Sequence, residues 1–275
     1  MKKIGFLLLL LCGSLNIGWA DQSDTQIHTQ IQCELHRRER AVIPRGKDKF
    51  PHVKLFESTS SNWSGYAATT KNHNKAKGSV TNVAGSWTVP SLLSSVDTTY
   101  SSFWVGIDGY SSGTVEQIGT EHDFTSGTQQ NYAWFEMYPQ GSYEITGFPC
   151  DIGDQISATV SYLGSNTFQL TIHNNTKSVY TVIPHSYTKS SKALRSSAEW
   201  ILEAPFSSQV LPLADFQTGV FTGCSATISG VTSNLNSSSW FIDCINMATN
   251  TGVIKALTSA TTDGGQDFSV SWRHQ

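Results

Sequence analysis

The residues best suited to acid–base chemistry lie in short segments that alternate polar and apolar side chains. Glu199 and Glu203 fall on the same side of one expected strand, because side chains along a strand point to alternating faces. Gln117 and Glu121 share a side of another expected strand. A carboxylate can take up and return a proton, and an amide can donate a hydrogen bond to a developing negative charge. These segments predict a polar sheet face suited to hydrolysis.

Two further segments add aromatic side chains to such a face. Trp104 and Asp108 alternate with apolar residues in one of them, and Trp134, Glu136 and Tyr138 do so in the other. A face made only for contact with water would carry Thr, Ser and Lys more often than Trp beside Glu. Four strands of this kind together predict a concave site with aromatic walls.

Other function classes share this pattern. Glu136 and Glu199 could be the paired acids of a glycosidase, which flank a sugar bound near aromatic side chains. The same face without a catalytic role would describe a lectin-like carbohydrate-binding module. The pattern alone leaves a peptidase, a glycosidase and a binding module open.

Serine and metal chemistry fit less well. Residues 109–113 (GYSSG) match the G-x-S-x-G pattern, but that pattern needs a helix after the serine, and β-like sequence follows here. No H-E-x-x-H motif is present. His122 stands between Glu121 and Asp123, but neighbours along a strand point to opposite faces, so these carboxylates would not bind a metal together with the histidine. We predict no serine triad, no metal site and no cofactor.

Five short motifs, in this order along the chain, resemble the glutamic peptidase (eqolisin) family. They are 62–65 (NWSG), 104–109 (WVGIDG), 117–119 (QIG), 132–139 (YAWFEMYP) and 198–203 (AEWILE). The resemblance extends from residue 62 to the C-terminal 268–271 (FSVS), which is nearly all of the expected mature domain.

This resemblance implies a fold, an activity and a set of roles. The fold would be an all-β, lectin-like (concanavalin-like) sandwich of two antiparallel sheets, and the activity that of an acid-active endopeptidase without a metal. The family's catalytic residues fall on Gln117 and Glu199. Its substrate-binding aromatic and acidic residues fall on Trp63, Trp104, Asp108, Glu136 and Tyr138.

The sequence departs from the family pattern at two positions. Glu121 stands where the family pattern has Asp, which keeps a carboxylate among the substrate-binding residues but alters its reach toward Gln117. Gln217 follows Asp215 and Phe216 where the family more usually has Gly. We expect the second change to affect a strand turn rather than the chemistry.

The elements that must hold these residues are strands. Ser, Thr, Val, Tyr, Phe and Trp are abundant, and runs of Ala, Leu, Glu and Lys that would form long helices are missing. Turn-forming residues separate twelve expected strands. These strands are 79–89, 101–108, 114–121, 131–138, 155–163, 167–174, 178–184, 197–203, 216–228, 239–246, 252–258 and 267–273.

The chain divides into three parts. Residues 1–20 have a basic start, a short apolar run and small residues at the exit, which predicts a signal peptide and a secreted protein. Residues 21–57 have mixed charge without apolar periodicity and are expected to be a propeptide. Residues 58–275 would form one β-sandwich peptidase domain, which we expect to be monomeric. No later segment is apolar enough to cross a membrane.

Charge differs between these parts. Residues 21–60 hold seven Lys or Arg and six Asp or Glu, whereas residues 61–275 hold nine and fifteen. The acidic domain has too few basic residues to favour nucleic acid as a partner. It also has few ion pairs for acid to disrupt, which predicts tolerance of low pH. The basic propeptide could bind across an acidic site and inhibit it. The expected substrates are polypeptides.

Cysteine spacing suggests disulfides rather than zinc. Cys33, Cys150, Cys224 and Cys244 would remain after export to an oxidising compartment. Closeness in sequence favours a Cys224–Cys244 pair.

Overall fold

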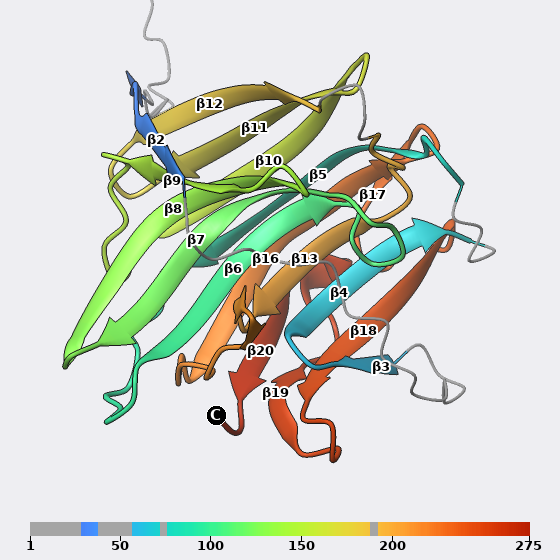
Figure 1. The fold of residues 1–275 in the computed structure, drawn as a ribbon. Helices are drawn as coiled ribbons and strands as arrows, with labels where there is room; N and C mark the ends of the chain where they lie inside the picture. Colours follow the sequence, from blue (N-terminus) through green and yellow to red (C-terminus); the bar gives the residue numbers. More distant parts are fainter. Residues whose placement is uncertain (1–28, 38–56, 72–75, 188–191) are drawn as a thin grey trace, which may run out of the picture.

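The structure is a computed structural model that describes residues 29–37, 57–71, 76–187 and 192–275. The described residues form strands and one short 3-10 helix (Figure 1). The strands are β1 (Thr29–Gln30), β2 (Glu34–Arg37), β3 (Glu57–Ser60), β4 (Trp63–Thr70), β5 (Val80–Thr88), β6 (Thr99–Ile107), β7 (Val115–Thr125), β8 (Thr128–Tyr138), β9 (Ser142–Thr146), β10 (Gln155–Gly164), β11 (Thr167–Asn174), β12 (Val179–Ser186), β13 (Ala198–Glu203), β14 (Phe206–Ser207), β15 (Gln209–Val210), β16 (Thr218–Ile228), β17 (Val231–Ser233), β18 (Trp240–Ala248), β19 (Ile254–Thr258) and β20 (Phe268–Trp272), and the helix is η1 (Asp263–Gly265).

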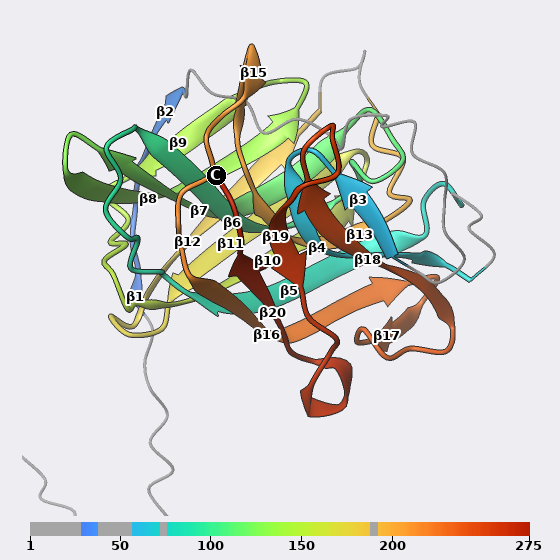
Figure 2. The ribbon, with the colours of Figure 1, turned by 90° about the horizontal axis from the view of Figure 1, so that it is seen from below.

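The strands fold into two stacked layers (Figure 2). The front layer runs β9-β8-β7-β6-β13-β4-β18, with β3 beside β18, and the back layer runs β12-β11-β10-β5-β16-β20. β19 pairs with both β18 and β20, so the two layers are one continuous ladder rather than two separate sheets. Most pairings are antiparallel, and β1 with β12 and β3 with β18 are parallel. The predicted all-β sandwich is confirmed.

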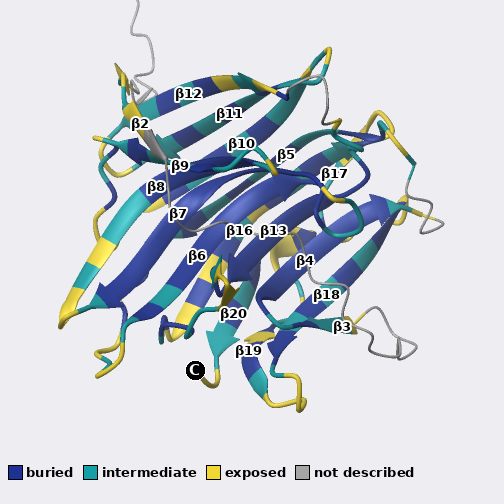
Figure 3. Ribbon diagram, in the orientation of Figure 1, coloured by how far each residue is buried: buried dark blue, intermediate teal, exposed yellow. Residues whose placement is uncertain are grey.

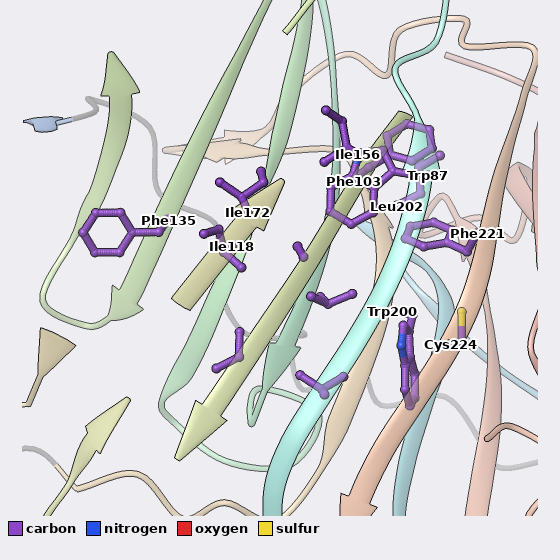
Figure 4. Close-up of a cluster of buried hydrophobic side chains, with 14 of the residues drawn as sticks. Trp87, Phe103, Ile118, Phe135, Ile156, Ile172, Trp200, Leu202, Phe221 and Cys224 are labelled. Carbon is purple, nitrogen blue, oxygen red and sulfur yellow. The ribbon is translucent and has the colours of Figure 1, made fainter. Parts of the chain in front are cut away.

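The core lies between the two layers (Figure 4). Phe103, Phe221 and Trp87 meet there, with ring centroids 5.6 Å apart for Phe103 and Phe221 and 5.9 Å apart for Trp87 and Phe221. In β11, buried Phe168 and Ile172 alternate with half-buried polar residues, so one side of this strand faces the core. Each large side chain buried in this way stabilises the fold by about 1.5–3 kcal/mol.

Several strands of the front layer are buried on both faces. β4, β7 and β13 are almost entirely buried along their length (Figure 3). On the side facing away from the back layer, hereafter the outer face, a second cluster contains Trp63, Trp104 and Trp134. This second cluster surrounds the polar residues that the sequence placed on one face.

The N-terminal strands close the edge where the two layers are otherwise open. β1 pairs with β12 of the back layer, and β2 pairs with β9 of the front layer. Between them, Ile31 and Cys33 pack against the core, and the Ile31 N–H donates to the Tyr180 carbonyl at 2.7 Å. These two strands were not among those predicted from the sequence, because residues 21–57 show no apolar periodicity. Residues 1–28 and 38–56, including the expected signal peptide, lie outside the described residues.

Other expectations also need correction. β4 and β9 were not predicted, because β4 is buried on both faces and lacks alternation, and β9 is only five residues long. The Cys224–Cys244 pair was wrong, since the four cysteines in the described part of the chain are free thiols. Cys224 lies on β16 and Cys244 on β18, and β20 and β19 separate those strands.

Candidate functional site

Four residues form a straight row across the front layer. Glu136 on β8 pairs with Gln117 on β7, Gln117 pairs with Gly106 on β6, and Gly106 pairs with Glu199 on β13. We call Glu136, Gln117, Gly106 and Glu199 the polar row. The Gln117 Nε2 group donates a hydrogen bond of 3.0 Å to Glu136 Oε2, which orients the amide. Strand pairing therefore brings together two residues that are 82 positions apart in sequence, Gln117 and Glu199.

Gly106 allows close packing in the middle of the polar row. Neighbouring strands lie about 4.8 Å apart, so the backbones of Gln117 and Glu199 are about 10 Å apart with Gly106 between them. A Cβ at Gly106 would lie 2.9 Å from the Trp104 ring and 3.2 Å from the Gln117 Cβ. The missing side chain lets the Trp104 ring lie close to the polar row between the Glu199 and Gln117 strands.

Glu199 is a fully buried acid with few hydrogen bonds to its carboxylate. It is 0% exposed, and within the described residues neither carboxylate oxygen has a hydrogen-bond partner of good geometry. Burial raises the pKa of Glu199 well above its ordinary value, and the nearby Asp108 carboxylate raises it further. The Ser197 hydroxyl and the Tyr110 backbone N–H lie near enough to lower this pKa in part. Burial thus favours the protonated form of Glu199, and these two neighbours favour the ionised form.

Asp108 is turned into the protein. Its carboxylate accepts hydrogen bonds from the Ser196 N–H at 2.9 Å, the Ser196 hydroxyl at 2.8 Å, the Arg195 N–H at 2.5 Å and the Thr114 hydroxyl at 3.3 Å. Burial raises the Asp108 pKa, and these hydrogen bonds oppose the shift. Asp108 therefore fastens the chain that leads into β13 and Glu199.

The predicted aromatic residues gather on the outer face. Trp63 and Trp104 pack edge to face with ring centroids 5.0 Å apart, and Tyr138 packs against the same cluster. The Trp104 Nε1 group donates to Glu203 Oε2 at 2.9 Å. Glu121 is fully buried on the same strand face as Gln117, two residues beyond Gly119.

Sequence reasoning missed several buried polar groups. Glu203 also accepts a hydrogen bond of 2.8 Å from the Asn62 side chain, and burial raises its pKa well above the ordinary value. Glu116 points to the core side of β7, where it is bonded to the Tyr187 hydroxyl at 2.7 Å, and burial likewise raises its pKa. Alternation places Asp243 on the outer face of β18, a signal that was present in the sequence.

Neither a metal cluster nor a membrane span was found in the part of the chain that the structure describes. Its His, Cys, Asp and Glu side chains form no group of three that could hold a metal ion. Its single helix is far too short to cross a bilayer.

Comparison with known proteins gives a consistent result. The family model described as the Peptidase A4 family matches residues 61–272. Aspergillopepsin-2 of Aspergillus niger is 29% identical over 198 residues, which cover 64% of this chain and 67% of that protein. Scytalidopepsin B of Scytalidium lignicola is 30% identical over 142 residues, which cover 48% of this chain and about half, 54%, of that protein.

Solved structures extend the similarity over the fold. Scytalido-glutamic peptidase bound to a transition-state analogue inhibitor matches with a TM-score of 0.65 and 25% identity, over 78% of this chain and 98% of that chain. Aspergilloglutamic peptidase from Aspergillus niger matches with a TM-score of 0.57 and 25% identity, over 64% of this chain and 99% of that chain.

Proposed function

Because this chain belongs to the Peptidase A4 family and is a glutamic-type endopeptidase, we propose that Glu199 and Gln117 are its catalytic pair. The observation that carries this proposal is the polar row, in which a buried carboxylate and an oriented amide lie on either side of Gly106. We further propose that the protein is exported and works on the acid side of neutrality on polypeptide substrates.

The reaction follows from the chemistry of the two side chains. Glu199 as a carboxylate takes a proton from a water molecule, whose oxygen attacks the carbonyl carbon of the substrate. Gln117 donates an amide N–H to the resulting oxyanion, and its bond to Glu136 holds the amide in this orientation. Glu199 then returns the proton to the leaving nitrogen as the C–N bond breaks. The products are a carboxylic acid and an amine.

The pH dependence follows from the same burial. Glu199 must be ionised to act as a base, and burial raises its pKa, so activity should rise with pH through a value above that of an ordinary Glu. The pKa values of the buried Glu116 and Glu203 carboxyls are raised as well, and the ionisation of these groups would add charge repulsion inside the front layer. The rate is therefore expected to fall once they ionise.

Gln117 also separates the two acids that a glycosidase would need. Glu136 lies three strands from Glu199 along the polar row, so their backbones are about 14 Å apart, and Gln117 is bonded to Glu136 between them. Paired acids of glycosidases lie roughly 5–9.5 Å apart at their carboxyl groups. The polar row suits a peptidase better.

The test is cleavage by the matured protein. A denatured protein and a panel of polysaccharides are incubated with it between pH 3 and pH 6.5. Peptide fragments support the proposal, whereas sugar release or retention without cleavage would favour the glycosidase or the binding module. Glu199→Gln should abolish cleavage, and Gln117→Ala should reduce kcat about 100- to 1,000-fold.

Matched controls make the same chemical changes elsewhere. Glu57→Gln lies at an exposed position of β3, and Gln169→Ala lies in the back layer. Both should leave kcat unchanged. Near-normal turnover by Glu199→Gln or Gln117→Ala, in folded protein, would rule out the assignment.

We propose in addition that residues 21–57 are an inhibitory propeptide. Residues 38–56 connect β2 to β3. β2 pairs with β9 and β3 pairs with β18, so the two ends of this connection lie at opposite edges of the front layer. A protein lacking residues 21–57 should be more active than the full chain near neutral pH, and equal activity would contradict inhibition.

A further inference from the structure

The loop between β6 and β7 has a defined conformation that the catalytic proposal does not use. It contains residues 109–113 (GYSSG), the motif that resembled a serine nucleophile pattern. The Gly109 N–H donates to the Ser112 hydroxyl at 3.0 Å, and the Ser112 hydroxyl donates to the Thr114 carbonyl at 3.2 Å. Gly109 has φ +101° and lies so close to Val115 that a Cβ would meet its side chain at 2.7 Å. The motif builds a tight turn rather than a nucleophile.

The tip of this loop is fastened to a distant strand. The Tyr110 hydroxyl donates a hydrogen bond of 2.7 Å to Asp243 Oδ2 on β18. The Ser58 hydroxyl donates to the same oxygen at 2.6 Å, and Asp243 is 3% exposed. β13 and β4 lie between β6 and β18, so this contact links the loop to β18 across the strand that carries the catalytic carboxylate.

Asp243 lies on the extension of the polar row. Glu199 pairs with Ala67, and Ala67 pairs with Asp243. Asp243 is therefore two strands from Glu199 on one side, as Gln117 is on the other. Ala67 has only a methyl group, which leaves room for Tyr110 to reach across. The Tyr110 backbone N–H lies beside the Glu199 carboxylate, where it favours the ionised form.

From these contacts, we propose that Tyr110 and Asp243 are positioning residues for the peptidase reaction. Their hydrogen bond holds the Tyr110 backbone against Glu199 and so fixes the carboxylate relative to Gln117. The hydroxyls of Tyr110 and Ser58 both donate to Oδ2, so we assign Asp243 the role of a hydrogen-bond acceptor. This inference rests on the proposed catalytic role of Glu199.

The first test removes the Tyr110 hydroxyl. Tyr110→Phe keeps the ring in the aromatic cluster and should lower kcat about 10- to 100-fold with KM within about threefold, because small misplacements of reacting groups act mainly on kcat. Tyr180→Phe is the control, since Tyr180 stacks on His173 at the β12 edge of the back layer, away from the site. A folded Tyr110→Phe protein with wild-type kcat would overturn the inference.

The second test separates hydrogen bonding from charge at Asp243. Asp243→Ala should lose kcat about as much as Tyr110→Phe, and the double variant should lose little more, because both changes break one contact. Asp243→Asn keeps an acceptor oxygen and should recover most of the kcat lost in Asp243→Ala. If Asp243→Asn is as impaired as Asp243→Ala, or if the two losses multiply, the positioning role is wrong.

The folding of Asp243→Ala and the activity of Glu199→Gln bear on how these tests are interpreted. If Asp243→Ala does not fold, judged by its circular dichroism spectrum and melting temperature, Tyr110→Phe and Asp243→Asn decide the question. If the wild-type protein cleaves and Glu199→Gln does not, the proposed function stands whatever Tyr110→Phe does. If Glu199→Gln cleaves normally, the catalytic proposal fails, and this inference fails with it.

Discussion

A buried histidine should limit the stability of this protein in acid. His122 is 0% exposed on the core side of β7. Its Nδ1 lies 3.1 Å from Asn131 Oδ1 and its Nε2 lies 3.0 Å from Thr120 Oγ1, which accepts a bond of 2.8 Å from Trp87 Nε1. An amide oxygen only accepts, so Nδ1 carries the hydrogen and Nε2 accepts from Thr120. With a neutral His122 ring, each donor in this series of hydrogen bonds has an acceptor.

The cost of protonating His122 can be worked out from its pKa. Burial lowers the pKa of His122 from 6.5 to about 4. The unfolded chain therefore binds a proton that the folded chain does not, and stability is lost as pH falls through this range. Relative to neutral pH, linkage gives a loss of about 2 kcal/mol at pH 5 and about 3 kcal/mol at pH 3.

The assay is urea unfolding, followed by tryptophan fluorescence between pH 7 and pH 3. His122→Gln should be less stable than wild type at pH 7 by about 1–3 kcal/mol, because the ring leaves a gap in the core. Between pH 7 and pH 3 it should lose about 3 kcal/mol less than wild type. His185→Gln is the control, since His185 is only half-buried and its pKa is lowered less. Parallel curves for wild type and His122→Gln would refute the reasoning.

Three other predictions concern the site and the sheet edges. Gly106→Ala should push the Trp104 ring away from the polar row and lower kcat/KM about 100-fold, while Gly113→Ala, with open space around its Cβ, should not change it. Deleting residues 29–37 should lower the melting temperature by about 4–8 °C and promote aggregation visible in light scattering, because two sheet edges lose their cover. Burial raises the folded-state pKa of Glu203 above its unfolded value, so the contribution of Glu203 to stability is lost as pH rises. Glu203→Gln should therefore make the free energy of unfolding less sensitive to pH above the ordinary Glu range.

Strand alternation in the sequence was enough to identify most residues of the polar face, but not to predict which of them lie side by side on neighbouring strands. It placed Glu199, Gln117 and Glu136 on polar faces of their own strands, as the structure does. The polar row depends instead on the register between strands far apart in sequence, which alternation does not encode. Resemblance to a family, not periodicity, selected Glu199 and Gln117 over Glu136 and Glu121.

Burial on both faces explains why β4 was not predicted from the sequence. β4 carries Trp63, Tyr66 and Ala67 without an exposed side, so no period of two marks it as a strand. Alternation placed Asp108 on a polar strand face, and the family resemblance placed it among the substrate-binding residues. Its φ of +71° turns the chain there, and the carboxylate accepts hydrogen bonds from the segment before β13. The turn at Gln217, with φ +61°, agrees with the family's preference for Gly at that position.

The buried groups together set a window of pH for the folded enzyme. His122 disfavours the folded state as pH falls, because its folded-state pKa is lowered. Glu116 and Glu203 disfavour it as pH rises, because their folded-state pKa values are raised. Glu199 belongs to the second group, yet it must ionise for the reaction. Ionising Glu199 for catalysis therefore works against the stability of the fold, and the contacts from Ser197 and Tyr110, which lower the pKa of Glu199, reduce this conflict.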